Sequence, residues 1–153
     1  VLDAATLLVP FVGFLPFDDP RVEATITAVE DRLTSPEGLV YRYDGTDGLP
    51  GDEGTFLLCS FWLVDALALT GRVDEAEQRL EELIDYVNPV GLLAEEIDES
   101  TGRQLGNFPQ AFSHIGLINS ALYVSRAKGM SVPGSELIGI ELGEGWTIEN
   151  TTE

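Results

Sequence analysis

Residues 55–87, "TFLLCSFWLVDALALTGRVDEAEQRLEELIDYV", contain two stretches of opposite character that meet at Gly71. Residues 55–70 are apolar nearly all round, which is typical of a helix that is buried on every side. Residues 72–87 repeat apolar side chains at helical spacing along one stripe and carry acidic side chains opposite it. That pattern indicates a helix with one face in solvent. Because helices commonly end at a glycine, Gly71 is expected to end the first helix. The stretch therefore predicts a tight hairpin of one buried and one exposed helix.

The same alternation extends in both directions along the chain. Residues 2–15, "LDAATLLVPFVGFL", have the character of a buried helix, and we interpret residues 1–10 as the end of a helix already under way in a longer polypeptide. Asp19 and Pro20 then open an amphipathic helix over 20–33, and Pro109 opens a mostly apolar one that closes at Gly129. The order buried, exposed, buried, exposed, buried predicts an all-α fold with alternating inner and outer helices.

Two long connections follow the two exposed helices, at 34–54 and 88–108, whereas the other connections are short. Unstructured loops of this length are usually functional, or they indicate that the assignment of helices is wrong. If the buried helices form an inner layer, both long loops lie at the N-terminal ends of those helices. We therefore expect the functional site at that end.

Composition limits the classes of function. The chain has 153 residues, 44% of them hydrophobic, which suits one domain with a single core. Its net charge is −19, with Lys128 as the only lysine, which argues against a nucleic-acid partner. A mean hydropathy of +0.08 argues against general disorder. A folded domain with so acidic a surface suits a high-salt milieu, and we predict a halophilic protein.

Several kinds of site are disfavoured by the sequence. No apolar run reaches about eighteen residues and no signal peptide is visible, so we predict a cytoplasmic protein without a membrane partner. Cys59 lies in "FLLCSFWL" and reads as a small core residue. His114, the only histidine, lacks partners for a metal site and is expected to be a hydrogen-bonded helix residue. We predict neither a metal nor a cofactor.

The 88–108 loop carries the strongest candidate chemistry, in "GLLAEEIDES" at residues 91–100. Glu95 and Glu96 follow an apolar run, and a partly buried carboxylate held on a loop can act as a general base toward water. Adjacent side chains in an extended segment point in opposite directions, so one could face a cleft and the other a hydroxyl group or solvent. In a chain with 27 acidic residues, a merely solvated acidic face is the alternative.

Two segments resemble glycoside hydrolase family 15, the family of glucoamylases, glucodextranases and microbial trehalases. Residues 94–122, "AEEIDESTGRQLGNFPQAFSHIGLINSAL", resemble its C-terminal catalytic segment through Ala94-Glu95-Glu96-Ile97-Asp98 and the following Gly102-Arg103-Gln104-Leu105. Residues 41–76, which begin "YRYDG", resemble the family's Arg-Tyr loop and the inner helix after it. Ile97 departs from the usual aromatic residue.

The resemblance implies a role for each matching residue. Glu95 would be the general base that activates water for attack with inversion at the anomeric carbon, and Glu96 would bind sugar hydroxyls. Arg42 would clamp hydroxyls in the first glucose subsite, and Tyr43, beside it in the same loop, would also bind the substrate. Phe112 either borders the sugar site or packs in the core. The general acid would lie upstream, so the resemblance implies that activity needs a missing N-terminal part of the same polypeptide.

The family's fold is an (α/α)6 toroid, of whose twelve helices about five are expected here. Residues 1–129 would be the C-terminal portion of the catalytic domain and 130–153 an acidic tail. The implied reaction is glucoamylase-like cleavage of α-glucan oligosaccharides with release of glucose, or hydrolysis of trehalose as the alternative. A tetratricopeptide-like binding scaffold is the rival that involves no catalysis, although no period near 34 residues recurs.

Overall fold

The computed structural model of the chain describes residues 1–45 and 54–130. Within them, a short 3-10 helix and four α-helices follow one another: η1 Ala4–Leu8, α1 Pro20–Leu33, α2 Leu57–Leu69, α3 Val73–Ile84 and α4 Ala111–Ala127. Three two-residue strands, β1 Thr55–Phe56, β2 Glu96–Ile97 and β3 Gln104–Leu105, form a small antiparallel sheet. Of the predicted acidic tail, everything after Met130 lies outside the described residues.

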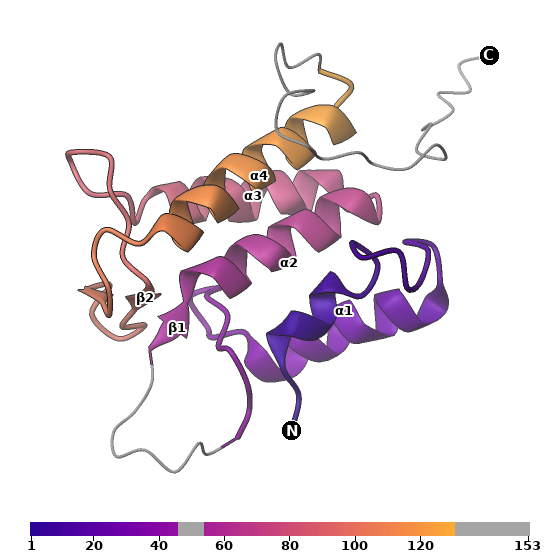
Figure 1. The fold of residues 1–153 in the computed structure, drawn as a ribbon, viewed down its shortest axis with the longest axis horizontal. Coiled ribbons are helices and arrows are strands. Elements are labelled where there is room, and N and C mark those ends of the chain that lie inside the picture. The colour runs from indigo at the N-terminus through magenta and orange to yellow at the C-terminus, as the bar shows by residue number, and fades with distance from the viewer. Residues whose placement is uncertain (46–53, 131–153) are drawn as a thin grey trace.

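The helices alternate in direction (Figure 1). α2 and α4 run the same way, with their N-terminal ends on the side where β1 and β2 lie, and α1 and α3 run back toward that side. α2 packs against both α3 and α4, and η1 packs against α1 and α2. The alternation of inner and outer helices agrees with the sequence pattern, and the arrangement is part of a helical toroid, the fold that the family resemblance implies.

Helix α2 is the centre of the core. Eleven of its thirteen residues are buried, including Phe61, Leu63 and Leu67. Helix α1 buries Val22, Ile26, Val29 and Leu33, which form the apolar stripe of the amphipathic helix expected over 20–33. Each such side chain contributes roughly 1.5–3 kcal/mol on burial. The buried and exposed characters expected for these two helices are confirmed.

The first predicted helix is wrong in extent. In place of a long helix over 2–15, the chain forms only the five-residue η1. The Asp3 carboxylate accepts a hydrogen bond from the backbone N–H of Ala5, which makes Asp3 an N-cap and starts the helix at Ala4. Pro10 lacks the N–H that an α-helix would need there, and the chain continues in turns to Pro16.

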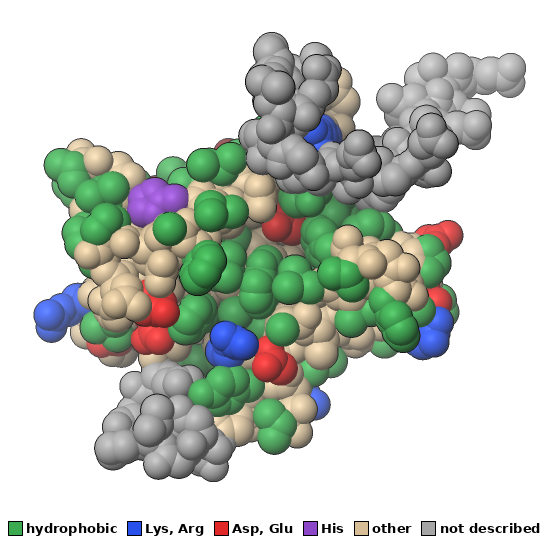
Figure 2. All heavy atoms as spheres, in the orientation of Figure 1, with side chains coloured by type: hydrophobic (Ala, Val, Ile, Leu, Met, Phe, Trp, Pro, Cys, Tyr) green, Lys and Arg blue, Asp and Glu red, His purple; other side chains and the backbone are tan. Residues whose placement is uncertain are grey.

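Helix α4 is less buried than its apolar sequence predicts. It packs mainly on α2 and α3, and its other side leaves Phe112, Ile115 and Ile118 more than half exposed. Figure 2 shows hydrophobic side chains gathered over the face on which α2 and α4 lie. None of the helices in the described parts of the chain is long and apolar enough to cross a membrane.

Helices α2 and α4 approach each other closely at Gly116. A Cβ atom at this position would lie 2.7 Å from Cδ2 and 3.0 Å from Cβ of Phe61. Because Phe61 is fully buried, it has little room to move away.

We therefore expect Gly116→Ala to destabilise the fold by about 1–3 kcal/mol through overpacking, in spite of the better helix propensity of alanine. Urea unfolding followed by circular dichroism measures the change. Phe61→Leu removes ring atoms from the clash, so the cost of Gly116→Ala should be smaller when both changes are combined. Equal costs in the two backgrounds would show that the contact with Phe61 is not the cause.

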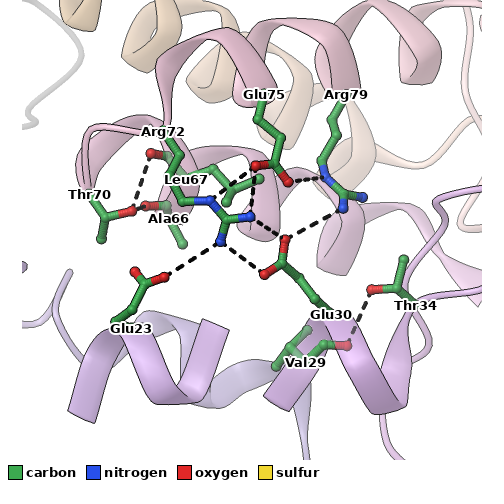
Figure 3. A network of polar contacts seen from close by, with 10 residues as sticks. All are labelled: Glu23, Val29, Glu30, Thr34, Ala66, Leu67, Thr70, Arg72, Glu75 and Arg79. Carbon is green, nitrogen blue, oxygen red and sulfur yellow. Dashed lines mark hydrogen bonds and ion pairs between the residues drawn. The ribbon is translucent and has the colours of Figure 1, made fainter. Parts of the chain in front are cut away.

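A cluster of charged side chains joins α1 to α3 (Figure 3). Arg72 donates from Nη1 and Nη2 to the two carboxylate oxygens of Glu30, at 2.9 and 2.8 Å, and also binds Glu75. Nη2 of Arg79 lies 3.6 Å from Oε1 of Glu30. The hydrogen bonds to Glu30 are the main reason why the pKa of Arg72 is raised. Because the geometry is bidentate and partly buried, this network fixes the outer helices against each other.

Candidate active site

The small sheet joins the two long loops. In β1, Thr55 and Phe56 pair with Ile97 and Glu96 of β2, and β2 pairs in turn with Gln104 and Leu105 of β3. β1 ends the first loop, whereas β2 and β3 form a hairpin within the second. The sequence does not predict this sheet, because two-residue strands are too short to show alternation.

Glu95 lies at the N-terminal ends of both α2 and α4. Its carbonyl oxygen accepts a hydrogen bond from the backbone N–H of Leu57, the first residue of α2, at 3.1 Å. The preceding carbonyl, of Ala94, accepts from Oγ of Ser113 in the first turn of α4, at 2.7 Å. The expectation that the long loops meet at this end of the inner helices agrees with these contacts.

His114 helps to fix the segment before Glu95. Nε2 of the ring accepts from the N–H of Leu93 at 3.3 Å, while Nδ1 lies 2.7 Å from the carbonyl oxygen of Gln110. This pair of contacts requires that the proton be on Nδ1. The histidine is a hydrogen-bonded helix residue, as expected.

The Glu95 carboxylate is bound by Asn107. Oε2 of Glu95 accepts from the backbone N–H of Asn107 at 3.0 Å and from its side-chain Nδ2 at 2.9 Å. The backbone N–H of Glu95 in turn donates to the carbonyl oxygen of Asn107 at 3.0 Å. Asn107 is not among the site residues predicted from the sequence, although a Gly-Asn pair directly after a strand is a turn signal that points to it.

Glu96 approaches the other loop. A Cβ atom on Gly54, just before β1, would lie 3.0 Å from Oε2 of Glu96, which is a tight contact. A Cβ atom on Gly106, just after β3, would lie 2.9 Å from Oε2 of Glu95. The two adjacent carboxylates therefore approach different neighbours of β2: Glu96 lies near the residue before β1, and Glu95 lies near the residue after β3.

Arg42 and Tyr43 come from the first loop. The carbonyl oxygen of Val40 accepts from the N–H of Phe56 at 2.8 Å, and Phe56 pairs with Glu96, so this loop runs beside the sheet. Nε of Arg42 lies 3.9 Å from a carboxylate oxygen of Asp3, and the Arg42 side chain is 44% exposed. Tyr43 forms a β-bridge with Asp3. Asp3 is the acidic partner of Arg42 within residues 1–45 and 54–130, and a sugar-binding role for Arg42 stays a prediction.

Phe112 lies at the start of α4 and is 61% exposed. The sequence left two roles open for Phe112, and this exposure excludes packing in the core formed by the described residues. Its role at a sugar site stays a prediction.

Other polar features are structural. The Ser100 hydroxyl and backbone N–H both donate to the Asp98 carboxylate and, with Thr101, lower the pKa of that carboxyl group, so these residues form a turn. Burial raises the pKa of Cys59 to about 12, which keeps the thiol protonated and inert. A polar hollow of about 550 Å³ lies between α3 and residues 34–38. Glu75, Gln78, Arg79 and Glu82 line it, and none of the predicted site residues does.

Comparison with known proteins identifies relatives for most of this chain. The family model described as glycosyl hydrolases family 15 matches residues 1–122. A trehalase from Mycolicibacterium smegmatis is 52% identical over 130 residues, which are 83% of this chain and 19% of that protein. A trehalase from Thermoplasma acidophilum is 47% identical over 120 residues, 78% of this chain and 21% of that protein.

A more distant relative, trehalase 1 from Sulfolobus acidocaldarius, is 31% identical over 130 residues, 85% of this chain and 22% of that protein. The chain thus spans about a fifth of the length of the curated relatives that it matches. No solved structure matches the chain.

Proposed function

The chain belongs to glycosyl hydrolase family 15, and from this premise we propose that it supplies the general base and part of the sugar site of an enzyme that hydrolyses trehalose with inversion. The observation that carries the proposal is the position of Glu95 at the N-terminal ends of α2 and α4. Its carboxylate is bound there through one oxygen by Asn107.

The proposed step uses Glu95 as a base toward water. A water proton passes to the Glu95 carboxylate while the water oxygen forms a bond to the anomeric carbon on the face opposite the leaving group. The bond from the anomeric carbon to the glycosidic oxygen breaks, and a carboxylic acid elsewhere in the enzyme gives that oxygen a proton. Inverting enzymes hold their two carboxyl groups roughly 6.5–9.5 Å apart so that the water fits between substrate and base.

We infer that the acid comes from residues outside this chain. The chain spans about a fifth of the length of its relatives. In an enzyme of that length, other segments would build most of the active site. The exposed side of α4, with Phe112, Ile115 and Ile118, is where further helices would pack. Activity is therefore expected only in a longer polypeptide that contains residues 1–130.

Trehalose is favoured over α-glucan oligosaccharides, which reverses the preference drawn from the sequence. The relatives with 52% and 47% identity are both named trehalases, and so is the relative with 31% identity. Four further residues are proposed to contact sugar hydroxyls or the sugar ring: Arg42, Tyr43, Glu96 and Phe112. The glucoamylase-like reaction, with release of glucose from longer α-glucans, is the second candidate, because the same Glu95 geometry would serve it.

The test begins with the intact mass of the natural polypeptide, followed by assays of trehalose, maltose and maltooligosaccharides. We expect a mass several times the 16.6 kDa of this chain and the highest kcat/KM for trehalose. Proton NMR of the fresh products distinguishes the stereochemistry, because inversion of trehalose gives one α-glucose and one β-glucose. Two α-glucose molecules, or higher kcat/KM for maltose, would contradict the proposal.

A further inference from the structure

Asn107 makes contacts that suit a role in the reaction rather than in the fold. Its side chain is exposed to solvent, and among the described residues its Nδ2 donates one hydrogen bond, to Oε2 of Glu95 at 2.9 Å. The backbone N–H of the same residue donates to the same oxygen at 3.0 Å. Two donors from one residue thus hold one oxygen of the carboxylate.

The other carboxylate oxygen is left available. None of the residues that the structure describes donates a hydrogen bond to Oε1 of Glu95. A carboxylate fixed through one oxygen presents the second in a defined direction, and its rotation about the terminal torsion, which is otherwise broad, is restricted. A general base needs an oxygen held in a defined direction, since that oxygen must lie within hydrogen-bond reach of the proton that it removes.

Gly106 allows the contact to form. Its φ of +70° lies in the left-handed region, which favours glycine, and a Cβ atom would lie 2.9 Å from Oε2 and 3.0 Å from Cβ of Glu95. The Glu95 side chain therefore folds directly over residue 106 to reach Asn107. The β2–β3 pairing and the hydrogen bond from the N–H of Glu95 to the carbonyl oxygen of Asn107 keep the two residues in register.

We propose that Asn107, seated by Gly106, is the positioning residue of the general base: it holds Oε2 of Glu95 so that Oε1 is directed at the attacking water. This inference rests on the proposed function, in which Glu95 is the base. Asn107 itself exchanges no proton and forms no bond to the substrate. Its effect is therefore expected in kcat and not in KM, because a misplaced base slows proton removal without weakening sugar binding.

The experiment uses the natural polypeptide that contains this segment, with trehalose as substrate. Asn107→Asp keeps the shape and the backbone N–H but replaces the donor by a second carboxylate facing Glu95. Asn107→Ala removes the donor alone. We expect kcat to fall roughly 100-fold for Asn107→Asp and roughly 10-fold for Asn107→Ala, with KM within about threefold of its original value, since small displacements of a catalytic group cost this much.

A matched control lies on α3, where Nε2 of Gln78 donates to Oε1 of Glu82 at 2.9 Å on the exposed face. Gln78→Glu makes the same exchange of an amide donor for a carboxylate opposite a glutamate. It should leave kcat and KM unchanged, and the melting temperatures of the two charge-adding variants should agree.

The outcomes separate the two proposals. An unchanged protein that does not hydrolyse trehalose, or a Glu95→Gln variant that still does, removes the proposed function and this inference with it. An active protein that Glu95→Gln inactivates, but whose kcat Asn107→Asp leaves within about threefold, overturns the role of Asn107 alone. A loss confined to KM, or failure of both Asn107 variants to fold, would overturn it equally, because Asn107 would then serve substrate binding or the fold.

Discussion

Replacement of Glu95 by glutamine is expected to lower kcat for trehalose roughly 100- to 10,000-fold in the longer natural polypeptide, the range that a general base contributes. Glutamine has nearly the same shape and its carbonyl oxygen still accepts the two hydrogen bonds from Asn107. It cannot take a proton from water. The change therefore removes the chemistry and leaves the loop in place, so the KM for trehalose should change little.

The matched control is Glu81→Gln, on the exposed side of α3, which makes the same change of charge away from the sheet. It should have no effect on kcat.

Steady-state assays with trehalose measure both variants, alongside Glu96→Gln, for which we expect a rise in KM as well as a smaller loss of kcat. If Glu96→Gln abolished turnover and Glu95→Gln did not, the roles assigned to these neighbours would be reversed.

Asp65 is expected to make the stability of the fold depend strongly on pH. This aspartate lies in α2 and is 4% exposed, with Oδ1 accepting from the Ser120 hydroxyl of α4 at 2.5 Å. Burial raises its pKa from 3.8 to about 7, although the hydrogen bond from Ser120 acts in the opposite direction. Tyr123, one turn further along α4, has its own pKa raised by burial and by the charge of Asp65.

The sign of the pH dependence follows from proton linkage. Between pH 3.8 and about 7 the unfolded chain has released the Asp65 proton while the folded protein retains it, so the free energy of unfolding falls as pH rises. The loss is complete above about pH 7 and amounts to at most about 4 kcal/mol, at 1.36 kcal/mol per pKa unit. Asp65→Asn keeps an acceptor for Ser120 without the charge. It should therefore stabilise the fold by roughly 2–4 kcal/mol more at pH 8 than at pH 4.

Urea unfolding at a series of pH values measures this difference, with the exposed Asp74→Asn in α3 as the matched control for net charge. The free energy of unfolding of Asp65→Asn should exceed that of the unsubstituted protein by an amount that grows between pH 5 and pH 7. The corresponding difference for Asp74→Asn should stay nearly constant. A constant difference for both variants would show that Asp65 is ionised in the folded protein throughout this range.

Most of the helical fold is predictable from the sequence. Periodicity alone finds α1, with its stripe from Val22 to Leu33, and the hairpin of α2 and α3. It fails at residues 2–15, because the capping side chain of Asp3 and the missing N–H of Pro10 outweigh a generally apolar composition. It also overestimates the burial of α4, since apolar periodicity does not say whether a partner for each side lies within the same chain.

The candidate site is predictable in part. The position of Glu95 at the helix ends follows from loop lengths, but the sheet that brings the two loops together has strands too short to leave a pattern. Asn107 was missed because hydrogen bonds between residues twelve apart depend on the tertiary path of the chain. The preference for a glucoamylase-like substrate had no physical basis in these residues, since most of the subsites would be built by other segments. The halophilic character of the protein stays a prediction.

The turn that joins β2 to β3 divides the second loop into parts under different evolutionary constraint. From Asp98 to Arg103 the chain closes on itself, through the bond from the N–H of Asp98 to the carbonyl oxygen of Arg103 and the bonds of Ser100 to Asp98. From Gln104 to Asn107 it binds β2 and Glu95. Insertions and deletions during divergence can therefore accumulate in the first part without moving the carboxylate. A change of length by a single residue in the second would shift the register of the contacts that Asn107 makes with Glu95.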